Sequence, residues 1–191
     1  MNKKDYKAIE AIVISMMNGL DSKLSYHSKF HTLDVIEQSL RIADAEGILE
    51  EIALMRLKFA ALFHDIGFLK TYVNHEAIGC EMFLEITKAY EFSDEDKACI
   101  QGLIMATKIP QKPTTLLQQI ICDADLDYLG RSDFFEIGDR LKDELLQFKM
   151  IADNDEWKER QLIFLKNHLY HTKSSQTVRE PVKQINYLKL H

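Results

Sequence analysis

The sequence predicts an all-α protein, a single-domain helical bundle. Apolar residues recur three and four positions apart along most of the chain, which is the period of an amphipathic helix. Only seven glycines and three prolines occur in 191 residues, too few for a turn-rich β architecture. Hydrophobic residues make up 46% and charged residues 28%, the balance of a globular domain with a sizeable core.

Three helices are expected in the first third of the chain, over about residues 5–20, 28–46 and 49–65. Gly19 and Gly47 are expected to end the first two, because glycine adopts the backbone conformation that commonly closes a helix. The third helix contains the stretch FAALF, apolar nearly all round, which predicts a central buried helix.

The next helices are located by their capping residues. Asn74 is expected to cap a helix that begins at the following residue. Ser93, with Asp96 three positions later, has the spacing of a capping box. The segment KIPQKPTT contains two prolines and predicts a loop, after which Thr114 or Thr115 caps another helix.

The C-terminal third is predicted to contain two more helices, around residues 134–151 and 154–170. The last twenty residues start polar and contain a proline, so we expect an extended or loosely packed tail. In HLYH, His168 and His171 have metal-like spacing but no third ligand nearby, so a helix-end surface pair is expected. His191 also lies in this region.

The charge and the cysteines argue against several classes of protein. The formal net charge of −6 disfavours a nucleic-acid duplex or an anionic membrane as the main partner. Cys80, Cys99 and Cys122 are far apart, with no CxxC pair, and are expected to be reduced thiols. The N-terminal apolar stretch is interrupted by Glu10 and is too short to span a bilayer, so a cytoplasmic location is the default expectation.

Histidine and aspartate stand together in LKFAALFHDIGFLK, where an apolar helix ends in His64 and Asp65. Burying two such groups is costly unless a partner satisfies them, and a metal ion is the usual partner. The dipeptide alone would more often be a helix-end hydrogen-bonding pair. The metal interpretation gains support from His31 upstream and Asp125 downstream, each in its own distinctive context.

The stretches YHSKFHT, FHDIG and DADL resemble the H…HD…D signature of the HD superfamily of metal-dependent phosphohydrolases. The resemblance covers roughly residues 20–135 and implies a helical bundle of the HD-domain type. It implies four metal ligands: His31, His64, Asp65 and Asp125. Two imidazoles and two carboxylates suit one divalent metal ion, with positions left for water and substrate. Mn, Fe, Co, Ni, Mg and Zn all remain possible.

The aspartate ligand has to be chosen among the three in CDADLDY, which are Asp123, Asp125 and Asp127. On a helix these residues point in different directions, so they cannot all face one ion. The family pattern favours Asp125, which follows an alanine and precedes a hydrophobic residue. Asp123 is the alternative ligand or lies behind the ligands, and Asp127 is expected to be solvated or to lie behind them.

His27 lies four positions before His31, on the same helix face. YHSKFHTLDV is similar to the Y-H-N-x-x-H-x-x-D-V stretch of cyclic-nucleotide phosphodiesterases, a branch of the same superfamily, with Ser28 in place of the asparagine. In that branch the first histidine protonates the leaving oxygen. The alternative is a helix-start histidine whose ring bonds a carbonyl oxygen.

His75, at the start of a helix, stands where many HD proteins carry a histidine that contacts substrate phosphate or a second metal. Two-metal members usually supply another histidine before the last aspartate, and residues 76–125 contain none, so a second metal lacks a usual ligand. Lys108 is expected to neutralise a phosphate oxygen, with Lys70 and Arg131 as further candidates; the default for each of the latter two is a solvated cation.

The resemblance implies metal-dependent hydrolysis of a phosphate ester, a nucleotide or cyclic nucleotide being the leading expectation. The metal would lower the pKa of a bound water, and Asp65 or Asp123 would take its proton. His27 or His75 would protonate the departing oxygen. One rival is a di-iron oxygenase, which needs further histidine ligands. The other is a catalytically silent regulator that binds a nucleotide or a partner protein.

The expected organisation has three parts, and a homo-oligomer is left open. They are an N-terminal helix packing on the domain (1–20), the HD domain (21–172) and a C-terminal tail (173–191).

Overall fold

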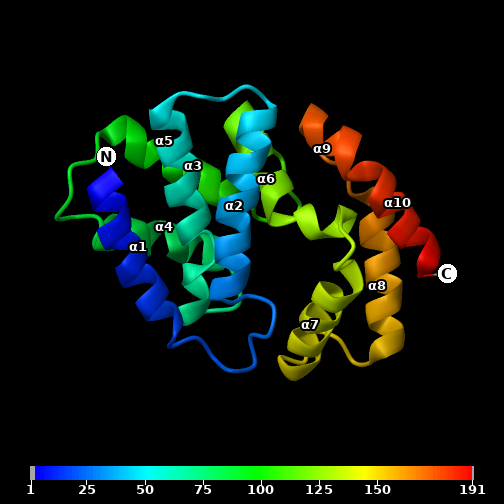
Figure 1. The fold of residues 1–191 in the computed structure, drawn as a ribbon. Helices are drawn as coiled ribbons and strands as arrows, with labels where there is room; N and C mark the ends of the chain where they lie inside the picture. Colours follow the sequence, from blue (N-terminus) through cyan, green and yellow to red (C-terminus); the bar gives the residue numbers. More distant parts are fainter. Residues whose placement is uncertain (1–2, 191) are drawn as a thin grey trace.

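The computed structural model describes residues 3–190, and every regular element within them is a helix (Figure 1). The all-α prediction is therefore confirmed. The α-helices are α1 (Lys3–Met17), α2 (Lys29–Ala45), α3 (Glu51–Phe63), α4 (His75–Ile86), α5 (Asp94–Ala106), α6 (Leu116–Asp125), α7 (Phe134–Gln147), α8 (Asn154–Asn167), α9 (Lys173–Val178) and α10 (Glu180–Lys189). Two short 3-10 helices, η1 (Ile66–Leu69) and η2 (Asp127–Gly130), follow α3 and α6.

Helix α3 is the centre of the N-terminal bundle, as the FAALF stretch predicts. It packs against α1, α2, α4, α5 and α6. Its residues 59–63 have no exposed surface, because neighbours cover the helix on all sides. The end of α3, where His64 and Asp65 follow, is thus held inside the bundle by burial of apolar surface.

A second apolar cluster joins the C-terminal helices to the bundle. It contains Tyr26, Tyr128, Leu129, Phe134 and Leu165, among others, and gathers around η2. Figure 1 shows α7, α8 and α10 on the far side of α6 from α1 and α5. No helix among residues 3–190 has the length and apolar character that crossing a membrane requires.

Two of the three predicted helix caps are confirmed. Ser93 accepts a hydrogen bond from the Asp96 backbone N–H, and Thr115 accepts one from that of Gln118. Helix α4 begins at His75 as expected, with Asn74 in the capping position, but Asn74 does not cap it with its side chain. Its backbone is left-handed, with φ of 59°, whereas a capping residue is normally extended, and its side chain makes no capping bond.

The expected loose tail is also wrong, because residues 173–189 form α9 and α10. Thr172 caps α9 by accepting a hydrogen bond from the Ser175 N–H. Pro181 lies in the first turn of α10, where its missing N–H leaves no bond unmade. Asn186 donates to two carbonyl oxygens beside η2, so the segment is fastened to the folded body.

His168 is not the surface residue that its spacing suggested. Its ring stacks on Phe164, lies edge-on to Tyr170 and contacts the fully buried Lys183. Burial and the Lys183 ammonium lower the pKa of His168 to about 3, so its imidazole is neutral. His171 is half-buried, and His191 lies outside the described residues.

Candidate metal centre

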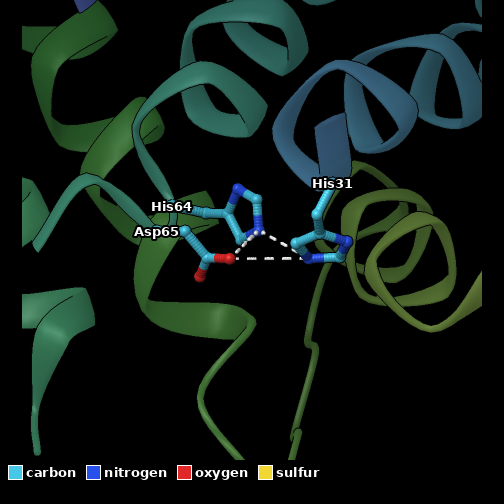
Figure 2. Close-up of side chains that lie close together, drawn as sticks. All are labelled: His31, His64 and Asp65. Atoms are coloured by element: carbon cyan, nitrogen blue, oxygen red, sulfur yellow. Dashed lines mark hydrogen bonds and ion pairs between the residues drawn. The ribbon is translucent and has the colours of Figure 1, made fainter. Parts of the chain in front are cut away.

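Four of the predicted residues meet at the ends of three helices. His31 lies in the first turn of α2, His64 and Asp65 directly follow α3, and Asp125 is the last residue of α6. Helices α2, α3 and α6 pack against one another, which brings these ends together. Figure 2 shows His31, from α2, and the consecutive residues His64 and Asp65, from the end of α3, pointing toward one another.

The ligand atoms of this cluster lie within contact distance. The Nε2 atom of His31 is 3.1 Å from Asp125 Oδ1, and the two histidine Nε2 atoms are 3.3 Å apart. Asp65 Oδ2 lies 3.1 Å from the Nε2 of His64 and 3.5 Å from that of His31 (Figure 2). The ligand atoms of His31, His64 and Asp65 all lie within 4.8 Å of one another, so this cluster can hold a metal ion.

One oxygen in the cluster has no hydrogen bond. Among the described residues, Asp65 Oδ2 is fully buried and has no hydrogen-bond partner. A buried carboxylate oxygen without a partner is strongly disfavoured. The two imidazole nitrogens beside it would satisfy it only if protonated. A divalent cation satisfies the oxygen and both nitrogens at once, so the donor set fits a metal.

The His64 ring is oriented by a hydrogen bond on its side away from the cluster. Its Nδ1 lies 2.8 Å from the carbonyl oxygen of Ala61, one turn earlier in α3, and is placed to donate to it. With Nδ1–H donating, the lone pair of Nε2 faces the cluster. A histidine held in this tautomer by a backbone carbonyl is the usual arrangement for a metal ligand.

The pKa shifts of the cluster residues show that the carboxylates of the cluster favour a positive charge there. Burial lowers the pKa of His64, but Asp65 and Asp125 oppose this effect and hold its pKa well above the usual range. Burial raises the pKa of Asp125, but hydrogen bonds from His31 and His64 bring it down to about 2. The two carboxylates therefore favour a positive charge at the cluster, as a bound cation would supply.

The family comparison agrees with this geometry. The model of the HD domain family matches residues 30–127, just over half of the chain, including all four cluster residues. The chain belongs to the HD domain family. Searches of curated proteins and of solved structures gave no match. The HD match ends at η2, so α7 to α10 lie outside it.

Within the HD domain, Asp123 and Asp127 point away from the cluster. Asp123 accepts hydrogen bonds from the N–H groups of His171 and Thr172 and from the Thr172 hydroxyl, at 2.6–2.8 Å. Its expected role as an alternative ligand or proton acceptor is therefore wrong. Asp127 is not solvated either, because it is fully buried between the Arg41 and Arg179 guanidinium groups.

His27 lies at the edge of the HD match, and its ring Nδ1 contacts a carboxylate oxygen of Glu144 on α7. The expected alternative, a bond to a carbonyl oxygen, is not what the ring makes. Glu144 is fully buried and also accepts from the N–H groups of Tyr26 and His27 and from the Tyr72 hydroxyl. Burial raises the pKa of Glu144, but the bonds with His27 outweigh burial and lower it.

His75 and His27 both stack on the Phe68 phenyl ring, and the centroids of the two imidazole rings lie 6.1 Å apart. The Nε2 of His75 is 3.4 Å from Asp65 Oδ1 and 3.6 Å from a carboxylate oxygen of Glu76. Burial lowers the pKa of His75, but Asp65 reverses the shift and raises it. His75 thus contacts the cluster through Asp65, and His27 lies beside His75 on the same phenyl ring.

The three cations expected to bind phosphate are placed differently. Lys108 is exposed and donates to the Asn74 side-chain oxygen at 2.7 Å. Lys70 borders a separate depression that includes none of the four cluster residues. Arg131 borders a small cavity with His31 and Asp125, but its guanidinium is already bonded to Asp34 and Asp133. These carboxylates compete with any phosphate for Arg131.

A larger cavity of about 420 Å³ opens on the cluster from the side of His27 and His75. It extends from Asp65 and Asp125 toward α7 and α8, outside the HD match. Sequence reasoning missed both this cavity and Glu144. In DELLQF the glutamate sits on an amphipathic helix, where glutamate normally faces solvent.

Proposed function

We propose that this HD domain is a metal-dependent phosphohydrolase. In this proposal His31, His64, Asp65 and Asp125 hold one divalent cation, and the substrate is a phosphate ester. The observation that carries it is the buried, unpartnered Asp65 Oδ2 beside two imidazole Nε2 atoms. The presence of two imidazoles favours a transition metal such as Mn, Fe, Co, Ni or Zn over Mg.

A divalent cation at this cluster supplies positive charge for the phosphate oxygens and lowers the pKa of a coordinated water molecule. The surrounding residues supply the rest. Asp65 Oδ1 faces the cavity beside His75 and is placed to accept a proton from that water. The two histidines that stack on Phe68 are the candidates to protonate the leaving oxygen.

His27 is the better placed proton donor. Its Nδ1 is bound by Glu144, so Nε2 is the nitrogen left to face the cavity. The buried carboxylate holds the ring at a fixed angle, as a base-orienting carboxylate does in other hydrolases. The Nε2 of His75 lies beside carboxylate oxygens of Asp65 and Glu76, which compete with substrate oxygens for it, so His75 is the second candidate.

Two rival functions have less support. A di-iron oxygenase needs histidine ligands for a second iron, and residues 76–124 contain no histidine. A catalytically silent regulator has no need of an intact cluster, nor of a histidine–glutamate pair aimed at it. Iron content with oxygen consumption, or tight nucleotide binding without turnover under every metal, would favour these rivals instead.

The proposal is tested by a metal-supplemented screen against nucleoside mono- and diphosphates, cyclic nucleotides and simple phosphoesters, with elemental analysis of the protein. His64→Ala and Asp65→Ala are expected to lose bound metal and hydrolysis together. His171→Ala, a matched change outside the cluster, is expected to keep both. Full-rate hydrolysis by metal-free protein would overturn the proposal.

A further inference from the structure

The cavity of about 420 Å³ has two chemically different ends. The inner end is polar and is formed by the cluster residues Asp65 and Asp125 with His27 and His75. The outer part extends between η2, α7 and α8. A ligand whose phosphate binds at the cluster has room for the rest of its body in this outer part, which has the size of a small-molecule site, whereas the cavity beside Arg131 holds only about 190 Å³.

The walls of the outer part are largely hydrocarbon. Those on η2, α7 and α8 include Leu129, Leu141, Leu145, Trp157, Phe164 and Leu165. All of them lie beyond residue 127, where the HD match ends. Which ligands this wall accepts is therefore determined by residues after 127, and not by the part of the chain that matches the HD family.

Few polar groups are present to bind a sugar or a nucleobase. The polar non-aromatic side chains that border the cavity outside the cluster and the two histidines are Glu76, which lies beside His75 at the inner end, and Thr107, Arg160 and Gln161 further out. The Thr107 hydroxyl already donates to the Ile104 carbonyl, and Arg160 is paired with Glu156 on the exposed face of α8. Gln161 is the one of the outer three that is free to bind a polar ligand group, against six hydrocarbon or aromatic side chains in the same wall. A nucleoside has ribose hydroxyls and base edges that lose free energy when they are buried without partners.

From this we propose that the substrate is a phosphate ester of an apolar alcohol, whose alkyl chain or aromatic ring fills the space between η2, α7 and α8. The inference rests on the proposed phosphohydrolase activity and names its substrate class. A hydrocarbon body gains free energy from every methylene group that it buries against these leucines and aromatic rings. The phosphate remains at the polar inner end.

Binding in this cavity can be followed by the fluorescence of a tryptophan in its wall. Trp157 is the only tryptophan in the sequence, and it borders the outer part. Intrinsic fluorescence of the Mn²⁺-loaded protein can therefore be titrated with n-alkyl phosphonates from ethyl to octyl, which contain no ester bond to hydrolyse. We expect affinity to rise about fourfold per methylene group until the cavity is filled. Affinity that does not depend on chain length would overturn the inference.

Substitutions in the cavity wall test where the hydrocarbon part of the ligand binds. Leu141→Gln and Leu145→Gln put an amide into the cavity wall and are expected to flatten the dependence of affinity on chain length. Ile163→Gln makes the same kind of change on the exposed face of α8 and is expected to leave this dependence as it is. Equal slopes in all three variants would contradict the proposed location. Thermal unfolding and metal content, measured on each variant, identify one that fails to fold.

Two outcomes separate this inference from the proposed function. If adenosine or uridine monophosphate binds more tightly than hexyl and octyl phosphonate, the substrate class is wrong although the hydrolase can stand. If no phosphoester is turned over with any metal, the proposed function fails, whereas the fluorescence titration still decides whether the cavity prefers hydrocarbon. A kcat/KM that rises with the chain length of alkyl phosphates supports both.

Discussion

Glu144 is the residue on which the arrangement of His27 most depends. Four donors converge on its buried carboxylate, from residues 26, 27 and 72. Such a carboxylate stabilises the fold as long as it is ionised, since every group that it binds is a donor. It also links two stretches of chain that are 117 residues apart in sequence.

Glu144→Gln should therefore reduce stability in a pH-dependent way. The pKa of Glu144 is lowered in the folded protein, so its contribution is fully present above its ordinary value of 4.5 and is lost as pH falls through the lower folded value. Denaturant unfolding should show a loss of about 1–3 kcal/mol at pH 7 that shrinks as the pH falls below 4.5. Glu136→Gln, exposed on the same helix, should change stability by less than about 0.5 kcal/mol. A loss independent of pH would contradict this assignment.

Asp123 and Asp125 are only two residues apart in sequence but bind different partners. Asp125→Asn should lose bound metal, since its Oδ1 lies in the cluster. Asp123→Asn should keep the metal but lose about 1–3 kcal/mol of stability, because an amide cannot accept all three bonds from His171 and Thr172. Elemental analysis with denaturant unfolding checks both. Metal loss in Asp123→Asn would reverse the assignment.

At the scale of elements, local signals predicted well where local chemistry decides. The buried end of α3 and the caps at Ser93 and Thr115 follow from residues next to one another in sequence. Helices α9 and α10 were not predictable in this way. They have 6 and 10 residues, which is too short to be stable alone; contacts with η2 hold α10 in place, and α9 packs against α10 and α2.

The contacts of α10 can be tested through Asn186. Its side-chain amide donates to the carbonyl oxygens of Leu129 and Arg131, both at 3.0 Å. Asn186→Ala should cost about 1–3 kcal/mol, because it leaves those carbonyls without this donor. Gln184→Ala, on the exposed face of α10, is the control and should cost far less. Urea unfolding curves that coincide for the two variants would contradict the role given to Asn186.

For the whole molecule, the site forms where two parts of the chain meet. Residues 30–127, the HD match, contribute the cluster, and its motifs were readable because each is a short local pattern. The C-terminal helices contribute Glu144 and most of the outer cavity wall. Nothing local marks these residues as part of a site, since a glutamate and leucines on an amphipathic helix have the same pattern in any bundle.

The central claim is that the four residues at the ends of α2, α3 and α6 form one metal site. Calorimetric titration of the metal-free protein with Mn²⁺ tests it most directly, and the result expected is one bound ion per chain. His31→Ala and Asp65→Ala should abolish this binding, while His171→Ala should retain it. Binding by the two cluster variants with the affinity of the unaltered protein, or no binding by the unaltered protein, would contradict the claim.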